Sequence, residues 1–138
     1  MSLFNIFDIA GSGLSAQTTR LNVTASNVSN AQSVASSPDS AYKARNPVFA
    51  TAFKDAFQTN SESAGVRTLG IVENNAEHPK RYEPGNPLAD GEGYIYLSNV
   101  NPIEEMTNMM SASRSYQNNV EVINTSKELL LQTLRLGE

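Results

Sequence analysis

The hydrophobic positions of this chain are ordered best at its two ends. Near the N-terminus, apolar residues recur every seven positions, and a second set falls three or four residues away. This spacing predicts one helical stripe over residues 3–31. The first set is Phe7, Leu14, Leu21 and Val28, and the second is Leu3, Ala10, Gln17, Thr24 and Ala31. Because Gly11 and Gly13 each cost roughly 1 kcal/mol against alanine inside a helix, we expect the first turns to fray when the chain is alone.

The pattern near the C-terminus is more regular. Steps of three and four residues continue without a slip from Met106 to Leu134, which predicts a helix of about 34 residues, roughly 50 Å long. Asn101 suits the N-cap, Pro102 the first helical position, and Gly137 marks the end. The stripe consists of Met106, Met109, Ser113, Tyr116, Val120, Ile123, Lys127, Leu130 and Leu134. We predict that this stripe pairs with the N-terminal one.

Between the helices, the sequence favours short strands. Two are predicted at residues 43–51 and 66–72, broken by Pro47 and Gly70 respectively, and a third at residues 94–97, where apolar positions alternate. The stretch 55–65 is polar and poor in aromatic residues, which is typical of a loop.

Turn chemistry separates these strands. Residues 36–39 form a turn cluster, and residues 82–93 (YEPGNPLADGEG) carry turn residues throughout. The predicted fold is therefore mainly α, with the two long terminal helices paired as an antiparallel, coiled-coil-like hairpin around a small β-rich or irregular insert. Its expected segments are an N-terminal helix in 1–35, the insert in 36–100 and a C-terminal helix in 101–138.

The composition restricts the classes of function that this protein can have. Only 7% of the 138 residues are aromatic, so any single core is modest. The net charge of -4 is scattered and forms no basic stripe, which argues against nucleic acid as a partner. The absence of cysteine excludes disulfides and thiolate chemistry. No run approaches the roughly 20 apolar residues of a membrane span, and no cleaved signal is evident. We expect no membrane insertion, and either a soluble chain or export without a cleaved signal.

Catalytic and metal-binding patterns are weak. His78 is the only histidine, and a metal site would need Glu73 and Glu77, one of which is its direct neighbour. A hydrolase would have to use this same histidine as its base. The Gly-Ser-Gly motif at 11–13 lacks the strand and lysine of a phosphate loop, and the acidic turn at 90–93 lacks further carboxylates for calcium. We therefore expect neither an enzyme nor a bound cofactor or metal.

Polar residues in both stripes make the helix pair marginal by itself. Gln17, Thr24, Ser113 and Lys127 interrupt the apolar seams, so a third surface is needed to complete the burial. This favours an assembly, although a monomeric helical hairpin capped by the insert remains open. The asparagines near the helix ends are open to two readings as well: they could be solvated amides, or they could bond laterally to neighbouring helices.

Several motifs resemble a known family. Residues 26–31 (SNVSNA) resemble the asparagine-rich N-terminal motif of bacterial flagellar rod and hook proteins, and residues 116–119 (YQNN) resemble its C-terminal counterpart. Residues 82–90 (YEPGNPLAD), with Gly93-Tyr94 and the segment 99–101 (NVN), resemble the basal-body rod proteins more specifically. The resemblance covers nearly the whole chain.

The resemblance implies a structural subunit of the proximal rod in the periplasm, exported through the flagellar type III channel without a cleaved signal. The terminal helices would be disordered in the monomer and pack into a helical tube that encloses the export channel and transmits torque from the ring to the distal rod and hook. Expected partners are copies of the chain, other rod proteins, the ring-to-rod adaptor and the export gate, with peptidoglycan nearby.

Two residue sets follow from this resemblance. The expected assembly contacts are Leu14, Leu21, Asn27, Val28, Asn30, Met106, Arg114, Tyr116, Gln117, Asn119 and Val120. The expected middle-segment motif is Tyr82, Pro84, Asn86, Pro87, Gly93 and Tyr94. A rival hypothesis is a periplasmic cell-wall-binding or adaptor module, folded as a monomer, that binds glycan through Tyr82, Tyr94 or Tyr96.

Overall fold

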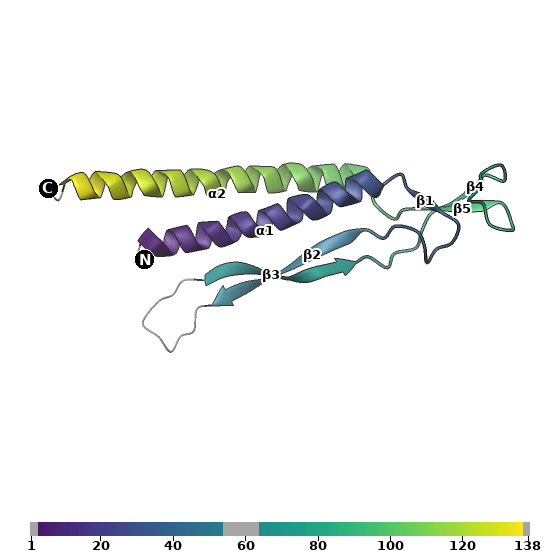
Figure 1. The fold of residues 1–138 in the computed structure, drawn as a ribbon, viewed down its shortest axis with the longest axis horizontal. Helices are drawn as coiled ribbons and strands as arrows, with labels where there is room; N and C mark the ends of the chain where they lie inside the picture. The colour runs from purple at the N-terminus through teal and green to yellow at the C-terminus, as the bar shows by residue number, and fades with distance from the viewer. Residues whose placement is uncertain (1–2, 54–63, 137–138) are drawn as a thin grey trace.

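The long elements of the protein lie side by side along one axis (Figure 1). The computed structural model describes residues 3–53 and 64–136. Along the chain the elements are α1 (Leu3–Asn30), β1 (Val34–Ala35), β2 (Arg45–Phe53), β3 (Ala64–Glu73), β4 (Lys80–Tyr82), β5 (Tyr94–Leu97) and α2 (Pro102–Leu136). Helix α1 is the middle layer, because it contacts α2 on one side and the β2–β3 hairpin on the other.

The two helices confirm the predicted antiparallel hairpin. Helix α1 has 28 residues and α2 has 35, within a residue or so of the predicted bounds. Asn101 caps α2 as expected, because its Oδ1 accepts hydrogen bonds from the N–H groups of Ile103 at 3.2 Å and Glu104 at 3.5 Å. Glu104 and Glu105 lie in the first turn, where the helix dipole favours negative charge.

The most deeply buried line of α2 is rotated away from the predicted apolar stripe. The buried residues of α2 are Glu105, Ala112 and Ser126. Each lies one position before a residue of that stripe, which is a rotation of about 100° around the helix. Met106 is 51% exposed and Leu134 is 62% exposed. The predicted stripe therefore lies partly at the margin of the contact. Its half-buried residues are Met109, Ser113, Val120, Ile123 and Leu130, and its exposed residues are Met106, Tyr116, Lys127 and Leu134.

The prediction for α1 was also partly wrong. Its buried side chains are Ala10, Ala16, Val23, Thr24 and Asn27, of which only Ala10 and Thr24 belong to the predicted stripe. The reason is the close approach of the helices: a Cβ added at Gly13 would lie 3.0 Å from Asn119 Nδ2. Such a spacing has room for alanine, serine and glycine at the contact and leaves long apolar side chains at its margins or outside it.

The β2–β3 hairpin is longer and more continuous than predicted. Pro47 lies inside β2 and pairs with Ile71, so it does not break the strand. A two-stranded sheet leaves both strands at an edge, where proline is tolerated. The register shifts between Val48, which pairs with Gly70, and Phe49, which pairs with Thr68, so Leu69 is the extra residue of a β-bulge. The predicted loop at 55–65 lies mostly outside the described residues, and its last two positions belong to β3.

A second, three-stranded sheet of order β1-β5-β4 forms the end of the molecule farthest from the termini, which we call the tip (Figure 1). Strand β5 confirms the prediction for 94–97, and its Ile95 is fully buried. The partner strands β1 and β4 were not predicted, because runs of two and three residues are too short to show a period. The turn at 36–39 is confirmed, since the N–H of Ala41 donates to Ser37 O at 3.1 Å.

Candidate functional site: the asparagine junction, the tip and the open helical faces

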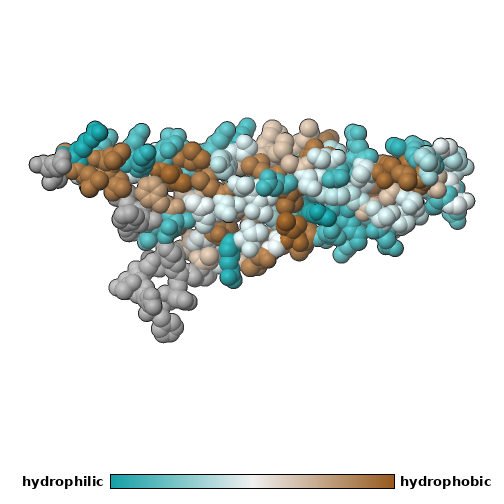
Figure 2. Space-filling model, in the orientation of Figure 1, coloured by the Kyte–Doolittle hydropathy of each residue, from teal (hydrophilic) through white to brown (hydrophobic). Residues whose placement is uncertain are grey.

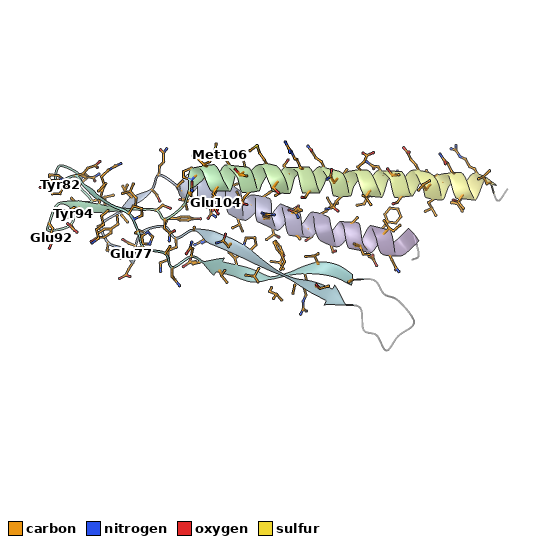
Figure 3. All side chains as sticks on the ribbon, turned by 180° about the vertical axis from the view of Figure 1, so that it is seen from behind. Glu77, Tyr82, Glu92, Tyr94, Glu104 and Met106 are labelled. Carbon is orange, nitrogen blue, oxygen red and sulfur yellow. The ribbon has the colours of Figure 1, made fainter. Side chains whose placement is uncertain are left out.

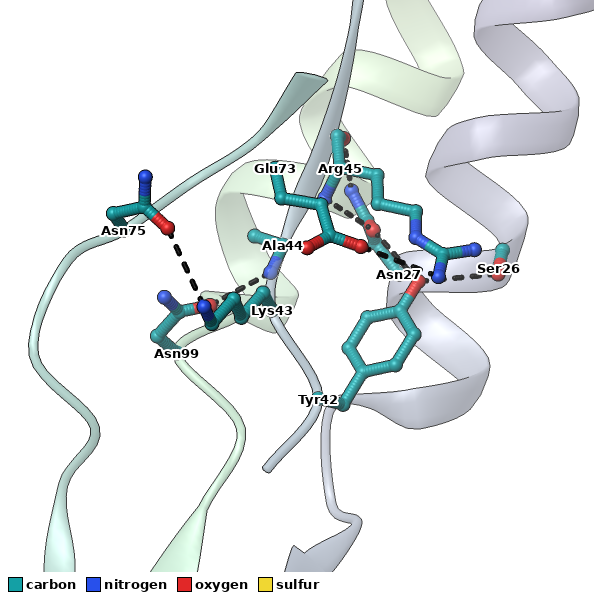
Figure 4. A network of polar contacts seen from close by, with 9 residues as sticks. All are labelled: Ser26, Asn27, Tyr42, Lys43, Ala44, Arg45, Glu73, Asn75 and Asn99. Carbon is teal, nitrogen blue, oxygen red and sulfur yellow. Dashed lines mark hydrogen bonds and ion pairs between the residues drawn. The ribbon is translucent and has the colours of Figure 1, made fainter. Parts of the chain in front are cut away.

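Asn27 joins the end of α1 to the start of the hairpin. Its Nδ2 donates to the carbonyl oxygen of Arg45 at 2.8 Å, and its Oδ1 accepts from the N–H of Arg45 at 3.0 Å (Figure 4). The Tyr42 hydroxyl also donates to Asn27 Oδ1, at 3.1 Å, which leaves the Ser26 hydroxyl as the donor to Tyr42 Oη. Asn27 is 0% exposed, so these hydrogen bonds lie inside the chain. In this position Asn27 orients the hairpin on the helix.

Asn99 holds the other side of the same junction. Its Oδ1 accepts from the N–H of Ala44 at 2.7 Å (Figure 4). Its Nδ2 donates to the carbonyl oxygens of Asn74 at 2.9 Å and Ala76 at 3.0 Å. Asn99 lies in the segment that leads into α2, so it connects both ends of the hairpin to the second helix. We call the network around Asn27 and Asn99 the asparagine junction. No periodic pattern reveals these partners, because they are far apart in the sequence.

The remaining α1 residues of the expected assembly set are largely engaged within the chain. Leu14, Leu21 and Val28 are half-buried along the helix. Asn30 is also half-buried, and its Nδ2 donates to the carbonyl oxygen of Ser26 at 2.8 Å, four residues earlier. The structure therefore places the asparagines of the SNVSNA motif in intramolecular hydrogen bonds.

The expected assembly residues on α2 are more open. Met106, Arg114, Tyr116 and Gln117 are exposed, whereas Asn119 and Val120 are half-buried and Asn119 lies against Gly13. Figure 3 shows Met106 on the side of α2 that points away from α1. Figure 2 shows further apolar surface along the C-terminal end of this helix, where the exposed residues include Leu129, Leu131, Leu134 and Leu136. Much of the apolar surface of α2 is thus uncovered in the isolated chain.

The middle-segment motif shapes the tip. The rings of Tyr82 and Tyr94 meet edge to face, with centroids 5.2 Å apart (Figure 3). Gly93 has a φ of 86°, and a Cβ there would lie 2.9 Å from a Tyr82 ring atom and 3.2 Å from Pro84 Cβ. Glycine is required at this position both by the backbone conformation and by the space available.

A chain of turns carries the backbone between β4 and β5. Asn86 Oδ1 accepts from the N–H of Leu88 at 3.0 Å, and its Nδ2 donates to Glu83 Oε2 at 3.1 Å. Pro87 is exposed and follows Asn86 within this turn. Asp90 Oδ1 accepts from the N–H groups of Glu92 and Tyr94, both at 2.9 Å. These are the side-chain-to-backbone bonds typical of Asx turns.

Two carboxylates of the tip are stabilised in their charged form. The N–H of Tyr94 is the main cause that lowers the pKa of Asp90, with smaller help from Glu92, Tyr96 and Gly93. The amide of Asn86 is the main cause that lowers the pKa of Glu83, helped by Arg81, whose Nε lies 2.7 Å from Glu83 Oε1. Hydrogen bonds to the anion favour ionisation in both cases.

The side chain of His78 lies against the backbone of β5. Its Nδ1 lies 2.9 Å from the carbonyl oxygen of Leu97, and its Nε2 is buried without a hydrogen-bond partner. Glu77, Lys80 and Tyr96 surround it in a surface hollow. Among residues 3–53 and 64–136, no group of three or more histidines, cysteines or carboxylates is placed to hold a metal ion. No helix in the same part of the chain is long and apolar enough to cross a membrane.

Comparison with known proteins gives a consistent result over the whole chain. The family model described as Flagella basal body rod protein matches residues 7–34, and the one described as Flagellar basal body rod FlgEFG protein C-terminal matches residues 92–136. The chain is 52% identical over 138 residues to the flagellar basal-body rod protein FlgC of Yersinia enterocolitica. It is 50% identical to those of Salmonella typhimurium and Escherichia coli O157:H7. All three alignments cover 100% of both chains.

Proposed function

The chain belongs to the FlgC family of flagellar basal-body rod proteins, and from this premise we propose that it builds the proximal rod by packing its terminal helices against those of neighbouring subunits. It is a structural component of the basal body and not an enzyme. The observation that carries the assembly mechanism is the apolar surface of α2, which stays open although the helix pair is formed.

That open surface has the apolar character of an interface. Ile103, Met106, Met110, Tyr116 and Val122 are all exposed on α2. Burying apolar surface stabilises an association by about 25 cal/mol per Å² before the entropy losses are counted. Methionine also fits an interface that repacks against more than one partner, because its side chain is flexible. A neighbouring helix would supply the burial that α1 does not.

The layered shape supports a tube of such subunits. Helices α1 and α2 run together along the long axis, so stacked copies would place rigid helices parallel to a shaft that transmits torque. We propose that the subunits repeat through two different patches, which gives an open helical assembly instead of a closed ring. Within it, the neighbours would be copies of the chain and other rod proteins, and at the base the ring-to-rod adaptor and the export gate. The tube would enclose the export channel, and the chain would reach the periplasm without a cleaved signal.

The assembly mechanism can be tested by placing charge on the middle of α2. We expect the double variant Y116D/V122D to retain its helical content by circular dichroism but to be absent from isolated hook–basal bodies and to leave cells non-motile. Thr125→Asp is the matched control, because Thr125 is an exposed polar residue of the same helix. Normal motility with Y116D/V122D would show that these two positions of α2 do not contact neighbours.

Hydrogen exchange provides a second test. If neighbours complete the helical packing, amides of α1 and α2 should exchange more slowly in the assembled rod than in the isolated chain. The amide of Ile95 in the tip is the internal control, because this residue is already fully buried in the isolated chain. Equal protection of the helices in both states would contradict the proposal.

Cell-wall binding is a second candidate function, because a tyrosine is exposed at the tip. Tyr82 is 62% exposed, and a sugar ring could stack on it. Isothermal titration of the purified chain against peptidoglycan fragments separates the two functions. Heat of binding that disappears in Tyr82→Ala would favour the cell-wall role, whereas a rod subunit that only passes through the wall should give none.

A further inference from the structure

Asp90 is the aspartate of this chain that precedes a glycine. The other aspartates, at positions 8, 39 and 55, precede isoleucine, serine and alanine. The carboxyl carbon of an aspartate can be attacked by the backbone nitrogen of the next residue, and a side chain on that residue hinders the approach. Glycine carries no such side chain. The Asp90–Gly91 pair is therefore where this reaction meets the least hindrance in the sequence.

The backbone nitrogen of Gly91 is uncovered in the folded tip. In the described part of the chain, its N–H makes no hydrogen bond, and a Cβ at this position would meet no atom within 4 Å. The pair Asp39–Ser40 differs, because the N–H of Ser40 is held by the carbonyl oxygen and the hydroxyl of Ser37, both at 3.3 Å. A free nucleophile thus lies next to Asp90 and not next to Asp39.

The carboxyl group of Asp90, in contrast, is held firmly by the tip. Its Oδ1 accepts from the N–H groups of Glu92 and Tyr94, both at 2.9 Å, and its Oδ2 accepts from the Tyr96 hydroxyl at 3.3 Å. These bonds lower the pKa of Asp90, the Tyr94 N–H most of all, so the group stays a carboxylate. A carboxylate resists attack by a nitrogen, because water leaves readily only from the protonated acid. The fold therefore keeps the carbon next to this nucleophile in its unreactive form.

We propose that Asp90–Gly91 is a site of spontaneous succinimide formation and isoaspartate conversion, which the folded tip keeps closed and which opens when the turn at 90–94 unfolds. The Gly91 nitrogen bonds to Cγ of the protonated side chain, the bond from Cγ to the hydroxyl breaks, and the hydroxyl leaves with the amide proton as water. Water then adds to one of the two ring carbonyls and reopens the ring. Opening at Cγ restores aspartate, and opening at the former backbone carbonyl gives isoaspartate. The reaction needs no other reactant and is independent of the proposed rod function.

Isoaspartate at position 90 is incompatible with the turn that the structure shows. The main chain would run through Cβ and Cγ and would be one carbon longer. The side-chain oxygen that accepts from Glu92 and Tyr94 would become a peptide oxygen, and the backbone oxygen that accepts from the Gly93 N–H at 3.0 Å would become part of a free carboxylate. A chain that is modified while its tip is open therefore cannot rebuild the same connection between β4 and β5.

Peptide mapping of the full-length chain tests the site. The chain is incubated at neutral pH in buffer and, in parallel, in guanidinium chloride, and is then digested with trypsin. Asp90 is the only aspartate in the tryptic peptide 82–114, so a second chromatographic peak of unchanged mass reports its isomerisation, whereas deamidation of an asparagine changes the mass. Labelling by an isoaspartate-specific methyltransferase identifies the peak. We expect it to grow roughly tenfold or more faster in guanidinium chloride, because the folded tip must first open.

Glycine variants separate the chemistry from the fold. Gly91→Ala fits the folded tip, since its Cβ meets nothing within 4 Å, and it should nearly abolish the second peak in guanidinium chloride. Gly93→Ala brings a Cβ to within 2.9 Å of the Tyr82 ring, so it should open the turn and raise the growth of the peak in buffer several-fold. Gly85→Ala is the matched control and should leave that growth unchanged. Equal growth in buffer and guanidinium chloride, no second peak in either, or an undiminished peak in Gly91→Ala would each overturn the inference.

Discussion

The side-chain amide of Asn27 bonds both backbone groups of Arg45: its Nδ2 lies 2.8 Å from the carbonyl oxygen and its Oδ1 lies 3.0 Å from the nitrogen. An asparagine near the end of a helix thus bonds the backbone of the first residue of β2, which also pairs with Glu73 across the hairpin. This arrangement fixes the direction in which the β2–β3 hairpin leaves the junction and lies along α1. Several consequences for stability can be measured.

Removing the Asn27 amide should be costly. In Asn27→Ala, the N–H and carbonyl groups of Arg45 lose their bonds to Asn27, and the Tyr42 hydroxyl keeps only its contact with Ser26, so we expect the free energy of unfolding to fall by about 2–3 kcal/mol. Urea denaturation of the purified chain measures this. Asn22→Ala is the control, because Asn22 is exposed on the same helix and its loss should change stability by less than about 0.5 kcal/mol. Similar midpoints for both variants would show that the junction does not hold the hairpin.

A side chain at position 93 should disrupt the tip. Gly93→Ala forces a Cβ into a left-handed backbone conformation and to within 2.9 Å of the Tyr82 ring, which should cost about 1–3 kcal/mol. We expect faster hydrogen exchange in β4 and β5 and a loss of the Tyr82–Tyr94 contact in NMR spectra. Gly85→Ala is the comparison, because no atom lies within 4 Å of its added Cβ. Unchanged spectra for Gly93→Ala would rule out the requirement for glycine.

The two glycines of α1 should respond differently to substitution. A Cβ at Gly11 meets nothing within 4 Å, so Gly11→Ala should raise the free energy of unfolding by about 0.5–1 kcal/mol through helix propensity. At Gly13 a larger side chain pushes against Asn119, so Gly13→Leu should separate the helices and lower stability. Thermal melts of the two variants give the comparison. A stabilising Gly13→Leu would show that the close approach of α1 and α2 is not needed.

The tip should lose stability in acid. Because the pKa of Asp90 is lowered in the folded chain, chiefly by the Tyr94 N–H, its contribution is present above the ordinary value of 3.8 and is lost as pH falls through the lower, folded value. Glu83 behaves in the same way: its contribution is present above its ordinary pKa of 4.5 and is lost as pH falls through the lower, folded value. Exchange rates in β5 should therefore rise as pH falls from 5 toward 3, after correction for intrinsic exchange. In Asp90→Asn this dependence should be weaker, and an unchanged slope would exclude Asp90 as a source.

Local features of the sequence predicted the elements well. The bounds of α1 and α2 follow from a period of three and four residues, and Asn101, Pro102 and the two glutamates that follow fix where α2 begins. Strand β5 and the turns after Tyr82 also depend on neighbouring residues, as the Asx bonds of Asn86 and Asp90 show. In each case the groups that decide the conformation lie within a few positions of one another.

The sequence by itself thus determined two long terminal helices with a turn-rich insert, and its motifs indicated the family. Only the tertiary structure decided which faces meet. An apolar stripe looks the same whether a helix of the same chain or of a neighbour covers it, and in the structure Glu105, Ala112 and Ser126 are buried whereas Met106 and Leu134 are exposed. The role of Asn27 was decided in the same way, because its partner is 18 residues away and depends on how the hairpin lies along α1.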